Sequence, residues 1–301
     1  MTDQRRGLLF GFGAYFIWGL FPLYWRLLKP AGAVEILAHR MLWSCVFVLL
    51  ALAALRRWSW FRTLAGRPKV LAILTLAAVL ISVNWGTYIY GVNTGRVVET
   101  SLGYFITPLV SVLLGVVVLR ERLRRVQWLA VGIGAAAVIV LTVDYGRPPW
   151  IAFVLACSFG VYGLLKKTAG APAAEGLAVE SGVLAPLALG YVCWLESTGD
   201  AHFGHVSAGH TVLLVSAGAV TAIPLLLFAG AANRVPLTTL GVLQYLAPVM
   251  QFAIGVLVLN ESMPPARLAG FALVWVALAV FTGDGLRTHR RQLAASTEAI
   301  C

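Results

Sequence analysis

The chain has 301 residues, of which 60% are hydrophobic and 12% are charged, and its formal net charge is +11. Soluble domains carry about 25% charged residues, so this chain has too few polar groups to cover a water-facing surface. The composition excludes a soluble globular protein and predicts an all-α protein that lies within a lipid bilayer.

Ten apolar runs of membrane-spanning length follow one another along the chain. About 20 apolar residues are needed to cross the roughly 30 Å of hydrocarbon in a bilayer. The connections between the runs are short, so no soluble domain is inserted. The predicted transmembrane helices cover residues 7–27, 34–55, 70–90, 97–119, 126–143, 150–166, 177–195, 211–231, 237–259 and 267–285.

The first run has one alternative interpretation, a cleaved signal peptide. Arg5 and Arg6 precede it, and the small residues Ala31-Gly32-Ala33 follow it as a cleavage site would. The run is longer and more aromatic than the apolar region of a signal peptide, so we interpret it as the first transmembrane helix.

The chain repeats itself at an offset of 140 residues. From Pro108 to Glu121, six of fourteen positions carry the same residue as the position 140 further on. Each copy holds five predicted helices, and because five is odd, the second copy is inverted in the membrane relative to the first. We expect an N-terminal unit of residues 1–144, a C-terminal unit of residues 145–287 and a cytoplasmic tail of residues 288–301. The matching positions begin at Pro108, Gly115, Val116, Val118, Leu119 and Glu121.

The positive charges predict the orientation. Most of the 23 lysines and arginines fall in the loops on one side of the predicted membrane, together with both chain ends. Cytoplasmic loops are enriched in these residues, so we expect both termini in the cytoplasm. The basic loops suit anionic lipid head groups, and the charge of +11 requires no nucleic-acid partner.

The second predicted helix carries three polar residues near its outer end, Glu35, His39 and Arg40. Glu35 and His39 are four residues apart and share one face of the helix. Such residues are costly in lipid and usually face a partner or a cavity. Two interpretations stay open: a structural anchor, or a substrate-carboxylate or proton-coupling site.

Two buried acids have predicted partners. Glu99, at the outer end of the fourth helix, is the acidic residue nearest in depth to Arg40, so we expect these two to pair. Glu180 lies near the cytoplasmic face, roughly 15 Å from the level of Arg40 in a hydrocarbon layer of about 30 Å. Its expected partner is Lys166 or Arg234.

Pro108 and Pro248 lie in the middle of the fourth and ninth predicted helices. A proline inside a helix removes a hydrogen bond and clashes with the preceding turn. We expect kinks that act as hinges around a cavity, with simple packing as the alternative.

Several aromatic and amide side chains lie deep in the predicted helices. They predict an apolar cavity with a few hydrogen-bonding groups, which suits a small amphipathic organic molecule. For each residue alone, packing is a more frequent role than contact with a ligand. The candidate cavity residues are Tyr15, Trp18, Asn84, Trp85, Tyr88, Tyr104, Ser111, Tyr162, Gln244, Tyr245, Gln251 and Trp275.

No pattern in the sequence predicts a cofactor or an enzyme. His202, His205 and His210 lie close together, but their spacing matches no zinc-binding pattern. The four cysteines have no paired spacing. We therefore expect no metal, no cofactor other than coupled protons, and no catalytic residues.

The fourth and ninth helices end in the same motif, Leu119-Arg120-Glu121 and Leu259-Asn260-Glu261. With the ten spans and the duplication, this resembles the EamA family of the drug/metabolite transporter superfamily. Segments 35–44, 101–110, 121–131 and 271–281 are similar to one permease branch of it.

That resemblance implies a permease or exporter in the bacterial inner membrane. It would move a small organic metabolite or drug by alternating access around a central cavity. The alternatives are a carrier of a lipid-linked substrate and, in another class, a membrane enzyme or assembly factor. Whether the protein is a monomer or a homodimer stays open.

Overall fold

The computed structural model describes residues 3–54, 64, 66–120, 123–170, 173–232, 234–235 and 237–298. Within these ranges, eight helices are long and apolar enough to cross a membrane, and Trp150–Lys166 and Leu246–Val258 are shorter apolar helices. The predicted all-helical membrane class is confirmed. The elements are α1 (Asp3–Leu27), α2 (Ala33–Ala54), α4 (Pro68–Asn93), α5 (Val97–Leu119), α6 (Arg125–Tyr145), α7 (Trp150–Ala169), α8 (Ala173–Thr198), α9 (Ala208–Ala232), α10 (Leu237–Leu243), α11 (Leu246–Ala253), η1 (Ile254–Val258) and α12 (Pro265–Glu298).

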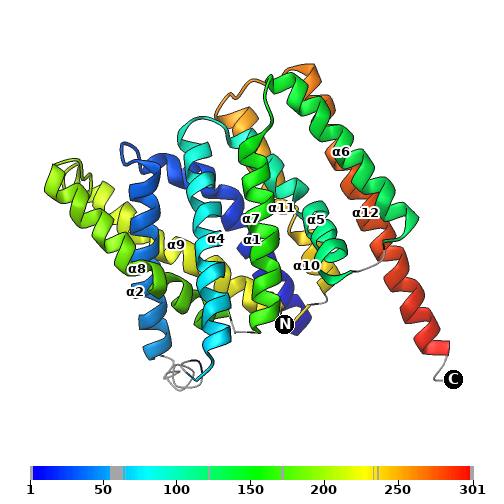
Figure 1. Ribbon diagram of the computed structural model, residues 1–301, viewed down its shortest axis with the longest axis horizontal. Coiled ribbons are helices and arrows are strands. Elements are labelled where there is room, and N and C mark those ends of the chain that lie inside the picture. The colour runs from blue at the N-terminus through cyan, green and yellow to red at the C-terminus, as the bar shows by residue number, and fades with distance from the viewer. Residues whose placement is uncertain are drawn as a thin grey trace.

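The helices form a broad bundle in which sequence-distant elements lie side by side. Helix α6 packs along α12 at one side of the molecule and α2 packs along α8 at the opposite side (Figure 1). Between them, α7 contacts α4 and α5, α1 contacts α9 and α11, and α2 also contacts α9. The start of α1 and the end of α12 both lie toward the lower edge of the view. We call this the lower end, and the opposite end, with loops 28–32, 94–96, 146–149 and 259–264, the upper end.

Small residues allow two of these contacts to be very close. A Cβ added to Gly103 of α5 would lie 3.0 Å from the carbonyl oxygen of Ala152 in α7. At Gly218 of α9, an added Cβ would overlap the backbone of Trp43 in α2. Helices in lipid associate largely through such close backbone packing, because lipid offers no hydrophobic drive between them.

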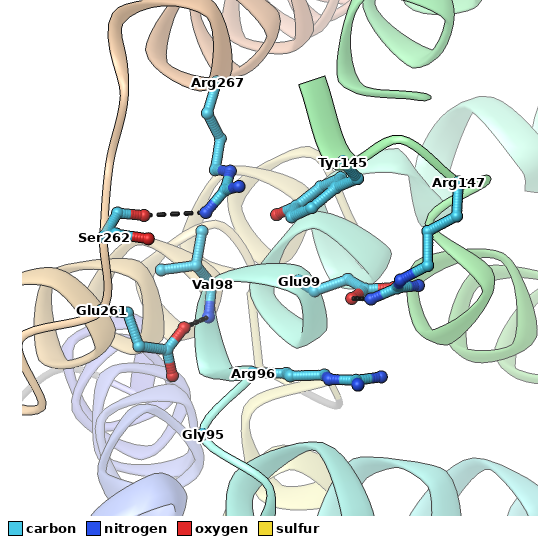
Figure 2. Close-up of a pocket in the computed structure, with 9 residues that line it drawn as sticks. All are labelled: Gly95, Arg96, Val98, Glu99, Tyr145, Arg147, Glu261, Ser262 and Arg267. Carbon is cyan, nitrogen blue, oxygen red and sulfur yellow. Dashed lines mark hydrogen bonds and ion pairs between the residues drawn. The ribbon is translucent and has the colours of Figure 1, made fainter. Parts of the chain in front are cut away.

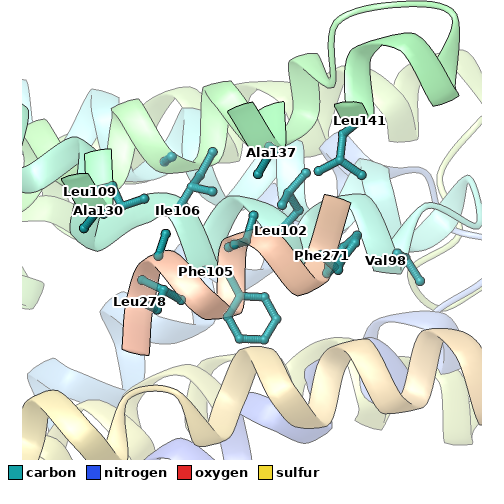
Figure 3. Packing of buried hydrophobic residues seen from close by; sticks show 14 residues of the cluster. Val98, Leu102, Phe105, Ile106, Leu109, Ala130, Ala137, Leu141, Phe271 and Leu278 are labelled. Carbon is teal, nitrogen blue, oxygen red and sulfur yellow. The ribbon is translucent and has the colours of Figure 1, made fainter. Parts of the chain in front are cut away.

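The largest apolar cluster joins α5, α6, α7 and α12. Phe105 of α5 and Phe271 of α12 are both at most 2% exposed, and their rings meet edge to face with centroids 6.4 Å apart. Leu141 of α6 completes the contact (Figure 3). This cluster fixes the outer pair of helices against the start of α5.

The two helices with central prolines differ. Helix α5 runs unbroken through Pro108, whereas the ninth predicted span is divided at Gln244 and Tyr245 into α10 and α11. The proline ring at position 248 clashes with the carbonyl four residues earlier, which is that of Gln244. A kinked but single helix over residues 237–259 is therefore the wrong prediction: Pro248 lies in the first turn of α11, and a π-helical turn, η1, follows.

The C-terminal helix also differs from its prediction. Helix α12 continues to Glu298, so the segment predicted as a tail, residues 288–301, begins inside a helix. Residues 299–301 lie outside the described part of the chain.

Candidate functional site

Arg40 lies among aromatic rings in the upper half of the bundle. Its side chain is 2% exposed, and its guanidinium carbon is 3.7 Å from the ring centroid of Trp85, on α4. The rings of Trp25 and Phe21, both on α1, follow at 4.9 Å and 5.6 Å. A cation over an aromatic face gains about 2 kcal/mol when it is shielded from water. We call Phe21, Trp25, Arg40 and Trp85 the arginine cage.

The cage contains hydrogen-bond donors that have no acceptor. The guanidinium of Arg40 makes no hydrogen bond or ion pair with any residue that the structure describes, and its Nε and Nη1 are buried and unpartnered. The indole N–H of Trp25 and the hydroxyl of the nearby Tyr88 are also buried without a partner. Buried polar groups are normally hydrogen-bonded, so this concentration of free donors around one charge calls for an explanation.

A satisfied network adjoins the cage. Asn84 of α4 donates to the carbonyl of Leu155 at 2.9 Å and to the Ser158 hydroxyl at 3.1 Å, both on α7. The Tyr104 hydroxyl of α5 donates to Asn84 Oδ1 at 3.1 Å, and the Tyr104 ring meets the Tyr88 ring edge to face. These bonds hold three helices in place beside Arg40, and they leave the Tyr88 hydroxyl free.

Glu99 does not pair with Arg40, so that prediction is wrong. Its carboxylate accepts hydrogen bonds from Arg147 at 2.8 and 3.4 Å and from the backbone N–H of Ile151 at 3.2 Å. The hydrogen bond to Glu99 raises the pKa of the Arg147 guanidinium above its ordinary value. Glu99 is the third residue of α5 and faces loop 146–149, whereas Arg40 lies about 10 Å along α2 and faces α1 and α4.

A small pocket of about 200 Å³ lies beside this pair at the upper end (Figure 2). Glu261, which follows η1, accepts the backbone N–H groups of Val97 and Val98 at 2.6 and 2.8 Å. A carboxylate there satisfies two of the donors that the first turn of a helix leaves free. Across the pocket, Arg267 donates to Asp144 at 2.8 Å. These contacts tie the end of the ninth span to the start of α5.

Glu35 and His39 both face the loop between α8 and α9. The Glu35 carboxylate accepts the backbone N–H of His202 at 2.8 Å and contacts its Nδ1 at 2.7 Å. The His39 ring stacks on Phe203 with centroids 4.7 Å apart. Consecutive loop residues therefore dock on the face that Glu35 and His39 share, which fits an anchoring role.

At the lower end, Glu180 pairs with Lys166 at 2.7 Å, as predicted, and accepts the Tyr162 hydroxyl at 3.2 Å. The alternative partner, Arg234, instead contacts Asp3 at 3.1 Å. The buried charge of Glu180 is therefore balanced within the protein.

Comparison with known proteins places the chain in a family. A model of the EamA-like transporter family matches residues 5–143. Over 293 residues the chain is 60% identical to Protein RarD of Streptomyces exfoliatus, covering 97% of this chain and 93% of that protein. This chain belongs to the EamA-like transporter family. Within the family it is RarD-like, and it is a multi-pass membrane protein.

Other relatives agree with this placement. The chain is 45% identical over 293 residues to the uncharacterized transporter YojE of Bacillus subtilis, covering 96% of this chain and 97% of that one. A solved crystal structure with 20% identity covers 92% of this EamA-family chain and 97% of its own, with a TM-score of 0.58. At that identity the likeness concerns the fold alone.

The predicted cavity residues of this EamA-family protein lie in several places in the bundle. Asn84, Trp85, Tyr88 and Tyr104 gather at the arginine cage, and Tyr162 belongs to the Glu180 pair.

The remaining predicted residues lie elsewhere in the bundle. The rings of Tyr15 and Trp18 meet edge to face, and both contact the Phe228 ring of α9. Gln251 donates to the Trp18 carbonyl at 3.0 Å. Tyr245 and Trp275 line an apolar cavity of about 280 Å³ between α5, α10, α11 and α12. Gln244 lies at the break before α11, and Ser111 lies exposed on α5.

Sequence reasoning missed Phe21, Trp25 and Arg147. Phe21 and Trp25 are four residues apart and therefore share a face of α1, which was a usable signal. Arg147 had a weaker one, since it lies in a short loop at the same predicted face as Glu99. Nothing in the sequence indicated that Arg40 would point at α1.

Proposed function

We propose that this RarD-like protein is a secondary carrier of a small organic solute in the bacterial inner membrane. Its ten transmembrane helices would form two inverted repeats that alternate between inward-open and outward-open states. Both termini would lie in the cytoplasm, at the lower end, where Arg124, Lys166 and Arg234 also lie.

One observation carries this proposal. The main contacts between a helix of one half and a helix of the other have counterparts in which the corresponding helices of the two halves change places. At the offset of 140 residues, α1 corresponds to α7, α2 to α8, α4 to α9, α5 to the α10–η1 segment, and α6 to α12. The contact of α4 with α7 is matched by that of α9 with α1, and α5 with α7 by α11 with α1. Helix α2 meets α9 as α8 meets α4, and α2–α8, α5–α11 and α6–α12 each join an element to its own counterpart.

Such an arrangement supports alternating access. If the two halves exchange conformations, the same set of contacts is rebuilt with the roles reversed, and the two states have similar energy. The arginine cage, in the upper half of the bundle and next to α7, is the place where a transported solute would meet a buried charge.

The test is flux across a membrane of defined composition. Purified protein in proteoliposomes loaded with a bacterial metabolite extract should release particular solutes unchanged in mass, faster than empty vesicles do. A paired run with an imposed pH gradient tests proton coupling. Solutes that change mass without crossing would instead indicate an enzyme, and no protein-dependent change in either would contradict the carrier.

A second candidate, a carrier of lipid-linked substrates, is favoured by the apolar cavity lined by Tyr245 and Trp275. Its lining is mainly apolar: the polar side-chain groups among its lining residues are the Tyr245 and Thr282 hydroxyls, 3.5 Å apart, and the Trp275 indole N–H. An acyl chain would fit such a surface, since it offers dispersion contacts and almost no hydrogen bonds. Movement of a fluorescent phospholipid between leaflets would support this candidate, while release of water-soluble solutes alone would exclude it.

A further inference from the structure

We propose that the arginine cage is a binding site for an organic carboxylate, and that organic carboxylates are the chemical class of the transported solute. This inference rests on the proposed carrier function for its physiological meaning. The proposed carboxylate binding can be tested whether or not the protein is a carrier.

The first argument is the sign of the unbalanced charge. Among the described residues, Glu35, Glu99, Glu175 and Glu180 are buried acids. Glu35 contacts His202, Glu99 pairs with Arg147, Glu180 pairs with Lys166, and Glu175 also has an interaction partner. Arg40 is buried to the same degree and has none. An unpaired charge in a bilayer costs several kcal/mol, and it is usually kept for function.

The second argument is the kind of polar atom that is left over. Arg40 Nε and Nη1 and Trp25 Nε1 are donors only, and the Tyr88 hydroxyl has a hydrogen to donate. Aromatic rings occupy the space around the guanidinium, yet they offer no lone pairs for its N–H groups. The missing partner is therefore an acceptor with negative charge and more than one oxygen, as in a carboxylate.

The third argument concerns the rest of the ligand. The rings of Phe21, Trp25 and Trp85 surround the guanidinium, so the part of the solute next to the carboxylate meets aromatic carbon. Binding sites for small organic molecules hold the apolar body against hydrophobic and aromatic side chains and the charged group through a few placed polar atoms. The favoured ligand is a monocarboxylate with an apolar or aromatic body, rather than a polyanion.

Binding can be measured without transport. The purified protein in detergent would be titrated with benzoate, indole-3-acetate and butanoate, each beside its uncharged primary amide, and followed by tryptophan fluorescence and thermal unfolding. At least one carboxylate should bind roughly 10- to 100-fold more tightly than its amide, the factor expected from charge-assisted hydrogen bonds. Equal binding of every acid and its amide, or no binding of any acid, would overturn the proposal.

Variants locate the site. Arg40→Gln should remove the preference for acid over amide, while Arg26→Gln, at an exposed arginine on α1, should keep it. Tyr88→Phe covers the case in which Arg40→Gln does not fold. It should weaken carboxylate binding, yet leave the ligand-free protein at least as stable, because it removes a buried hydroxyl without a partner. An unchanged acid preference in both Arg40→Gln and Tyr88→Phe would also overturn the proposal.

The two proposals fail in different ways. Carboxylate binding that depends on Arg40, without any flux in proteoliposomes, would contradict the carrier function and support the carboxylate-binding site. Flux of uncharged solutes by a protein that binds no carboxylate would keep the carrier and remove the site.

Discussion

Arg40 and Glu99 are both 2% exposed and both lie in the upper half of the bundle, but their charges are balanced in different ways. Glu99 has an arginine and a backbone N–H as partners, so its charge is balanced by contacts that hold α5 to loop 146–149 and α7. Arg40 has only aromatic faces. The contrast shows that burial alone does not distinguish the two charges, whereas the presence or absence of a counter-charge does.

Among the buried charges that have a partner, we expect the largest loss of stability when the Lys166–Glu180 pair at the lower end is broken. Lys166→Ala would leave Glu180, 3% exposed, with the Tyr162 hydroxyl as its remaining partner. Breaking a buried pair from one side costs about 3–5 kcal/mol, and the partial exposure of Lys166 favours the lower value. Thermal unfolding in detergent measures this, with Lys69→Ala as an exposed control. A parental unfolding midpoint would show that Glu180 does not need its partner.

The upper pair should couple more weakly, because Arg147 is 36% exposed. A double-mutant cycle of Glu99→Gln and Arg147→Gln should give a coupling of about 1–3 kcal/mol, in the range of hydrogen bonds to charged groups. The cycle of Glu99→Gln with Arg40→Gln should instead be additive within about 0.5 kcal/mol. Strong coupling in the second cycle would restore the pair that the sequence suggested and remove the contrast.

A smaller effect is expected where a balanced charge contacts only backbone. Glu261→Gln keeps one acceptor for the N–H groups of Val97 and Val98 and loses the charge that favours a helix start. The expected loss is about 1 kcal/mol, the usual value of a helix cap. Hydrogen exchange at the first turn of α5 should rise together with the loss of stability. Unchanged exchange there would mean that the cap is dispensable.

Much of the fold followed from the sequence, because length and apolarity decide which segments cross a bilayer. The observed partner of Glu180, Lys166 of the preceding helix, was one of the two residues that the sequence predicted. Depth is only one coordinate, however. It suggested Glu99 as the partner of Arg40, and it could not show that α2 turns Arg40 toward Trp25 and Trp85.

The prolines show a second limit. Pro108 and Pro248 occupy equivalent positions in the repeat, yet α5 stays continuous and its counterpart breaks at Gln244. The helical pattern in the sequence is the same for both, so tertiary packing decides whether the chain keeps or gives up the turn before the proline. Their role as hinges stays a prediction.

The central claim is that the charge of Arg40 is reserved for a solute while that of Glu99 holds the fold. It is tested most directly by solute flux per folded molecule in proteoliposomes made side by side from the parent, Arg40→Gln and Glu99→Gln. The free energy of unfolding of Arg40→Gln should lie within about 1 kcal/mol of that of the parent, because removal of an unpaired buried charge offsets the loss of the cation–π contacts. The solute flux of this variant should be abolished. Glu99→Gln should be less stable and keep most of its flux. Full flux by a folded Arg40→Gln protein would contradict the account and make Arg40 a packing residue.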